Sequence, residues 1–112
     1  MATIKEDYCS QEVYRLLIEK GFDGEIHTTY DKEGYTQASI TLQIAMKWLR
    51  EVHNWTICIS PYWPEGDMRN KLTWYYDIHS LIDNRSFRES GYTDNYTEAC
   101  EAAIKYSLEN LI

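Results

Sequence analysis

The sequence has little proline, little glycine and no long hydrophobic run. With 2 prolines and 5 glycines among 112 residues, collagen-like and low-complexity chains are excluded. The longest apolar stretches, such as residues 16–18, are far shorter than the roughly 20 residues that a membrane-spanning helix needs. The first residues include Glu6 and Asp7 and lack the hydrophobic stretch of a secretory signal. We therefore expect a cytoplasmic protein that does not bind a membrane.

Basic residues and cysteines are also scarce. The chain has 11 Lys and Arg against 18 Asp and Glu, and its net charge is −7. Nucleic-acid-binding proteins need basic stripes that neutralise phosphates, so we expect no direct nucleic-acid binding. The acidic surface favours a basic protein partner, or simply keeps the protein in solution. The cysteines Cys9, Cys58 and Cys100 are too widely spaced for a Cys-x-x-Cys metal site, and we expect each to be a small buried residue.

Apolar residues and tyrosine are what the chain does have. Apolar residues make up 44% of the chain, which at this length indicates one globular domain over residues 1–112. Ten Tyr and four Trp stand against two Phe, so most of the aromatic side chains have a polar end. Such side chains suit half-buried positions and interfaces. This surplus is the compositional indication of a binding surface.

Hydrophobic periodicity predicts three helices. The first covers residues 10–20 and stops at Gly21, the second follows Thr41, and the third runs from near Asn95 to the C-terminus. The second helix has apolar residues at steps of three and four, which predicts a face that packs on the core. These residues are Leu42, Ala45, Met46, Leu49 and Val52.

Alternating patterns and turn residues predict up to five strands. They cover residues 25–30, 35–40, 55–62, 72–81 and 86–89. Residues 31–34, Asp-Lys-Glu-Gly, form a turn between the first two. The order is then α-β-β-α-β-β-(β)-α. This order predicts an α+β fold: one antiparallel sheet of about four to five strands, with about three helices packed mainly on one face.

The strand at residues 72–81 carries a candidate interaction surface. Alternation directs Tyr75 and His79 away from the predicted core, while Trp74, Tyr76 and Ile78 face it. The Tyr-Trp pair that ends the preceding strand stands between two prolines, at a loop edge. Tyr and Trp dominate interface hot spots. If no helix covers the outer face of the sheet, we expect the surface to contain Tyr62, Trp63, Tyr75 and His79.

Chemical motifs are sparse. Asp77 and His79 share the outer face of one strand, and a carboxylate that orients a histidine is half of an acid–base pair. They motivate an alternative function, a small-ligand-binding or hydrolytic domain. The other histidines, His27 and His53, lie at no metal-ligand spacing, and no nucleophile stands in a recognisable elbow. We predict no catalytic residue, no metal ligand and no cofactor.

Parts of the chain resemble a group of small uncharacterised proteins that gut anaerobic bacteria carry, often in phage or mobile-element regions. The resemblance covers residues 36–112. Its most specific parts are Lys-Trp-Leu-Arg-Glu at residues 47–51 and Tyr-Thr-Glu-Ala at residues 96–99. It implies a cytoplasmic accessory protein of unknown activity. Together with the sparse chemistry and the tyrosine surplus, it leads us to predict a non-enzymatic protein-interaction module.

Two further alternatives stay open. Glu98, Glu101 and Glu109 fall on the last predicted helix, which suits a nucleic-acid mimic that occupies a basic groove of its partner. A solvated helix face explains the same carboxylates equally well. A homodimer through an uncovered sheet edge or sheet face is the other alternative.

Overall fold

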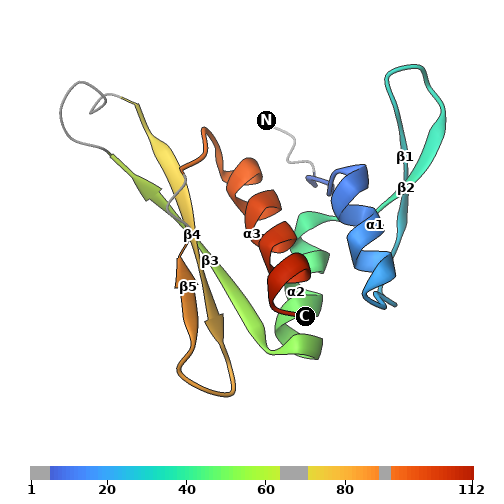
Figure 1. Cartoon of the computed structure of the whole chain (residues 1–112). Helices are drawn as coiled ribbons and strands as arrows, with labels where there is room; N and C mark the ends of the chain where they lie inside the picture. Colours follow the sequence, from blue (N-terminus) through green and yellow to red (C-terminus); the bar gives the residue numbers. More distant parts are fainter. Residues whose placement is uncertain (1–5, 64–70, 89–91) are drawn as a thin grey trace.

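The computed structural model describes residues 6–63, 71–88 and 92–112 of the chain. It is an α+β fold with three helices and two antiparallel sheets (Figure 1). The helices are α1 (Gln11–Glu19), α2 (Leu42–His53) and α3 (Tyr96–Asn110). The first sheet is a hairpin of β1 (His27–Tyr30) and β2 (Thr36–Ser39). The second has the order β3-β4-β5, with β3 (Trp55–Tyr62), β4 (Thr73–Ser80) and β5 (Ser86–Arg88).

The helices begin and end where the sequence predicts. The side chains of Ser10, Thr41 and Asn95 each accept a hydrogen bond from the backbone N–H three residues later, which confirms them as N-caps. Helix α1 stops before Gly21, whose φ of +94° is in the left-handed region that glycine adopts without strain. Helix α2 ends at Asn54, which is also left-handed. None of the helices that the structure describes is long and apolar enough to cross a membrane.

Helix α3 lies between two groups of buried side chains. On one side it packs with α1 and α2, where Leu17, Leu49 and Ile104 are fully buried. On the other side it packs on the β3-β4-β5 sheet, where Ile78 and Ala103 are fully buried. Figure 1 shows α3 along one face of this sheet, with α1 on the opposite side of α3. The sheet therefore has a covered inner face and an outer face.

The expectation of one sheet of four to five strands is wrong. β1 and β2 pair only with each other, and they lie beyond α1, far from the other three strands (Figure 1). The two strands read His-Thr-Thr-Tyr and Thr-Gln-Ala-Ser, so neither offers an apolar face to pack against a helix. Ser39, at the base of the hairpin, is the one strand residue of this pair that is buried. Because of this arrangement the helices also do not all lie on one face of a sheet.

Two other expectations about buried residues, those for Val52 and Cys58, are wrong. Val52 is 55% exposed in the last turn of α2, although its spacing predicts a core position. Trp48 stands beside the predicted apolar stripe, and it is buried in the core, where it packs edge-on against Phe22. Cys9 and Cys100 are buried, as predicted, whereas Cys58 is exposed. Cys58 stands opposite Asp77 in the β3–β4 register, on the outer face of the sheet. No described element covers that face.

Candidate functional site

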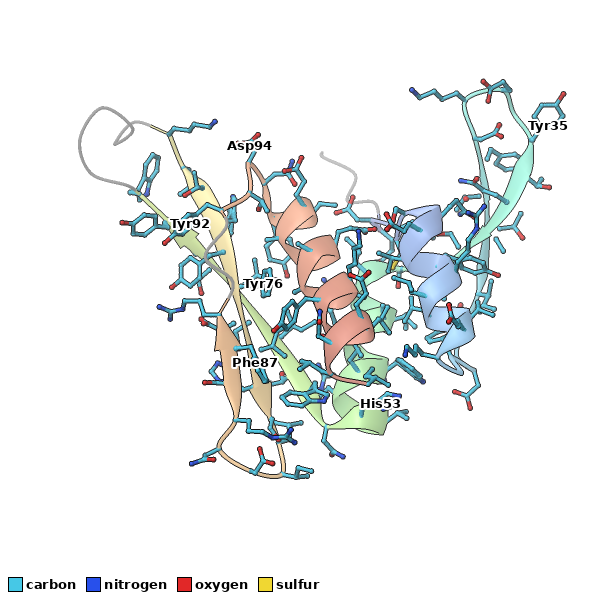
Figure 2. The ribbon with its side chains drawn as sticks, in the orientation of Figure 1. Tyr35, His53, Tyr76, Phe87, Tyr92 and Asp94 are labelled. Carbon is cyan, nitrogen blue, oxygen red and sulfur yellow. The ribbon has the colours of Figure 1, made fainter. Side chains whose placement is uncertain are left out.

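The candidate site lies on the outer face of the β3-β4-β5 sheet. Along β4, Tyr76 and Ile78 are buried toward α3, so the alternate residues Tyr75 and His79 point to the outer face, as the sequence predicts. Figure 2 shows Tyr76 between the sheet and α3, and Tyr92 on the opposite side of the sheet. Among the described residues, no helix covers that opposite side (Figure 1).

Three tyrosines gather on this face, and we call them the tyrosine cluster: Tyr62, Tyr75 and Tyr92. The rings of Tyr62 and Tyr92 are stacked, with centroids 5.1 Å apart and planes 19° apart. The ring of Tyr75 meets both of them edge-on, at 6.5 Å and 6.0 Å. Stacked and edge-to-face pairs are the arrangements that aromatic rings prefer. Tyr62 is 41% exposed and Tyr92 is 54% exposed, so the cluster offers ring surface to a partner.

Arg88 of the edge strand β5 holds one side of the tyrosine cluster. Its guanidinium lies 5.1 Å from the ring centroid of Tyr75, within cation–π range. Its Nε donates a hydrogen bond to Asp77 Oδ1 at 2.7 Å, and its Nη2 donates to Oδ2 at 3.3 Å. The hydrogen bond that Arg88 donates to the Asp77 carboxylate raises the pKa of Arg88 above its ordinary value. A permanent cation therefore sits against Tyr75.

The predicted surface is partly assembled. Tyr62 and Tyr75 meet in the cluster, and Trp63 follows Tyr62 directly with 60% of its surface exposed. His79 is four residues beyond Tyr75 on the same face, which places it roughly 13 Å away along the strand. It therefore belongs to the outer face but not to the tyrosine cluster.

Sequence reasoning missed Tyr92 and Arg88. Arg88 faces Asp77 only because β5 pairs with β4 in this register. Tyr92 reaches the sheet because its neighbour Thr93 forms an isolated bridge with Trp74. Neither contact leaves a local pattern in the sequence, since each joins residues from separate segments. The surplus of tyrosine was the one available signal.

The second candidate site, Asp77 with His79, lacks the contact that acid–base chemistry requires. The Asp77 carboxylate accepts its hydrogen bonds from Arg88, and the described structure contains no hydrogen bond between Asp77 and His79. A carboxylate held in this way does not orient an imidazole. In the part of the chain that the structure describes, no group of three His, Cys, Asp or Glu side chains could hold a metal ion.

The carboxylates of α3 are used within the fold. Glu101 accepts a hydrogen bond from the backbone N–H of Ser10 at 2.9 Å. Glu98 accepts one from the backbone N–H of Asp94 at 3.3 Å. Two of the three carboxylates that suggested a nucleic-acid mimic therefore hold the start of α1 and the start of α3.

A separate hollow of about 330 Å³ lies between α2 and β3. Its lining mixes apolar side chains with polar and cationic ones, among them Gln43, Lys47, Arg50, Ile57, Ile59 and Tyr96. Partial burial raises the pKa of the Tyr96 hydroxyl above its ordinary value. The hollow and the tyrosine cluster share no residue, because Ile57 and Ile59 point to the inner face of the sheet.

No protein-family model matches the chain, and neither the curated proteins nor the solved structures contain a significant match. The likeness to phage and mobile-element proteins therefore stays a prediction.

Proposed function

We propose that this protein is a non-enzymatic interaction module that binds a basic protein through the tyrosine cluster and Trp63. The observation that carries the proposal is the gathering of three tyrosine rings on a sheet face that no described element covers. Rings in mutual contact keep their positions, so they need little further ordering when a partner binds. Tyr and Trp are also the residues that most often dominate binding energy at interfaces.

The charge of the chain supports a basic partner. A net charge of −7 attracts basic proteins over a distance and accelerates their encounter. At close range, guanidinium groups bind to the faces of aromatic rings. The protein already holds one such contact, since Arg88 lies over Tyr75. Arginine side chains of a partner would make the same contact with the exposed faces of Tyr62 and Tyr92.

The cellular setting that we propose is that of an accessory protein of a phage or mobile element in the cytoplasm of its host. The segments Lys-Trp-Leu-Arg-Glu and Tyr-Thr-Glu-Ala support it through their resemblance to such proteins. An accessory protein without chemistry of its own acts by occupying a surface of another protein. This fits the interaction role.

The proposal is tested by capture from nuclease-treated lysate of the native host, with the tagged protein in three forms. The forms are the native chain, the cluster variant Tyr62→Ala/Tyr92→Ala, and the control variant Tyr30→Ala/Tyr35→Ala. The control removes two tyrosines of the hairpin that are even more exposed, at 72% each. It therefore matches the chemistry of the change but not its location.

We expect the native and control forms to capture the same basic protein, and the cluster variant to lose it. Added salt should weaken the capture, because charge attraction is screened. A cluster variant that captures the protein as well as the native form would overturn the proposal. A lysate in which none of the three forms captures a protein would also count against it, and would favour the small-ligand alternative near Asp77 and His79.

A further inference from the structure

β3 has one edge that pairs with β4 and one edge that pairs with no described strand. Trp74 of β4 exchanges both backbone hydrogen bonds with Thr93, at 3.0 Å and 2.8 Å, so its N–H and C=O point away from β3. In an antiparallel ladder both groups of a residue point to one side, and the side alternates along the strand. Trp74 stands opposite Pro61, so Pro61 does not bond to β4. By the same alternation, Ile59 and Ile57 direct their N–H and C=O to the other edge of β3.

No described strand pairs with that other edge. The proline at position 61 has no N–H to offer there, which blunts the end of the edge. Ile57 and Ile59 keep theirs, so a row of unused backbone groups remains over the middle of an eight-residue strand. Such a row is a template for one more strand.

The side chains of the same two residues line the hollow beneath α2. Ile57 and Ile59 point to the inner face of the sheet, and the hollow of about 330 Å³ lies between them and α2. A strand added to the edge would lie about 4.8 Å from β3 and would turn alternate side chains to the same inner face. Those side chains would enter the hollow. Backbone pairing and a side-chain pocket are thus offered at one place, which is the arrangement used in peptide recognition by strand addition.

The charge of the hollow selects the occupant. Lys47 and Arg50 lie three residues apart on one face of α2 and both line the hollow. Neither forms an ion pair with a described residue, although the chain has 18 acidic residues against 11 basic ones. Two unpaired cations beside apolar side chains suit an acidic side chain flanked by apolar ones.

A second copy of this chain fits less well. Two β3 edges paired around a two-fold axis would bring the two α2 helices side by side on one face of the joined sheet. Lys47 and Arg50 of one copy would then face the same residues of the other, and like charges across an interface oppose association. Charge therefore favours an acidic segment over self-association.

We propose that the edge of β3 and the hollow under α2 bind an extended acidic peptide segment as a fourth strand, with an Asp or Glu side chain directed at Lys47 and Arg50. The site uses a different edge and different residues from the tyrosine cluster. It stands or falls independently of the function proposed above.

The test begins with selection from a random library of seven-residue peptides against the native protein. Peptides with Asp or Glu two residues away from an apolar residue should be enriched, because side chains two apart share one face of a strand. The selection is repeated with Lys47→Gln/Arg50→Gln, which changes two exposed side chains and leaves the core intact. The control Arg15→Gln/Lys32→Gln changes the net charge by the same amount, at exposed positions away from the hollow.

The most enriched peptide is then made in two forms. One has an unmodified backbone, and in the other the central amide is N-methylated. We expect the Lys47→Gln/Arg50→Gln variant to bind it about tenfold more weakly or worse, and the control variant to bind it like the native protein. N-methylation of the peptide should abolish binding. With the unmethylated peptide bound, the NMR signals of the Ile57 and Ile59 amides should shift, and their hydrogen exchange with solvent should slow. No enrichment, equal binding by both variants, or shifts confined to Tyr62 and Tyr75 would each overturn the proposal. So would protection of the Ile57 and Ile59 amides by dimer formation without peptide.

Discussion

The hairpin β1–β2 and the sheet β3-β4-β5 both display exposed tyrosines, but the tyrosines differ in their neighbours. Tyr30 and Tyr35 of the hairpin are 72% exposed, and neither ring contacts another ring of the described structure. Tyr62, Tyr75 and Tyr92 of the sheet contact one another. Exposure alone would therefore rank the hairpin first as a binding surface, whereas preorganisation ranks the sheet first.

The difference follows from what lies behind each pair of strands. The sheet has a buried inner face, with Ile78 and Tyr76 packed toward α3, so its outer side chains stand on a fixed base. The hairpin has no apolar face, and a two-stranded ribbon alone is only marginally stable in water. The lesson is that a cluster of side chains becomes a rigid surface when the opposite face of its strands is buried.

The largest effect should come from removing the base of the sheet. Ile78→Ala should lower the free energy of unfolding by about 2–5 kcal/mol, because Ile78 is fully buried and a cavity would remain. Thr28→Ala on the exposed face of the hairpin should change it by less than about 0.5 kcal/mol. Urea unfolding followed by tryptophan fluorescence measures both. Equal effects would mean that the hairpin is as much a part of the cooperative core as the sheet.

The second prediction concerns the junction between the hairpin and the core. Cys9 lies there, with its carbonyl accepting a hydrogen bond from the Ser39 hydroxyl at 3.2 Å and its N–H donating to the Ile40 carbonyl at 2.8 Å. Burial raises the pKa of the Cys9 thiol from 9.0 to about 12. Between those values the unfolded chain gives up a proton that the folded chain keeps. The Cys9 thiol therefore does not lower the free energy of unfolding below pH 9, and it lowers it progressively as pH rises above 9.

The expected loss from this one thiol is at most roughly 1.4 kcal/mol per pH unit. Unfolding free energies measured between pH 8 and pH 11 should fall more steeply for the native protein than for Cys9→Ala, at each pH relative to the same protein at pH 8. Parallel curves for the two proteins would show that Cys9 is not shielded at the junction.

The third prediction concerns the hairpin turn. Gly34 has a φ of +88°, where a residue with a side chain is strained by about 1–2 kcal/mol. Gly34→Ala should therefore loosen the hairpin, and the amide of Asp31, which donates to the Tyr35 carbonyl at 2.9 Å, should exchange faster. The amide of Ile78 should exchange at its native rate, because the sheet is a separate unit. Faster exchange at both amides would contradict the independence of the two regions.

The smallest effect should come from Arg88→Ala. The Arg88 side chain is 66% exposed and its Asp77 partner 16% exposed, and an ion pair open to solvent on the arginine side contributes little to stability, so the urea midpoint should move only slightly. The NMR signals of the Tyr75 ring should nevertheless shift, since the guanidinium lies over it. A large loss of stability with an unchanged Tyr75 signal would mean that Arg88 has a structural role in β5 rather than a role in the tyrosine cluster.

Local patterns predicted most of the fold. Ser10, Thr41 and Asn95 mark the helix starts, and alternation along β4 separates Tyr75 from Tyr76. The prediction of a single sheet was wrong because alternation identifies strands without indicating which strands pair. A hairpin without an apolar face gains nothing from joining the sheet behind α3.

The candidate surface was predictable to the extent that it depends on one strand and its neighbour. Tyr62 and Tyr75 follow from the two strands and their register. Tyr92 and Arg88 do not, because each reaches the cluster through a contact between distant segments. Cys58 was expected to be buried, and its exposure shows that β3 has a polar outer side as well as an apolar inner one.

That exposed thiol provides the most direct test of the central claim, that a partner binds the outer face of the sheet. Cys58 is the one exposed cysteine, since Cys9 and Cys100 are buried. A partner seated on the tyrosine cluster with a typical footprint of about 800 Å² would also cover Cys58. The measurement is the rate at which iodoacetamide alkylates the folded protein, with and without saturating amounts of the captured partner. The account predicts that the partner slows alkylation of Cys58 several-fold, and an unchanged rate would contradict it.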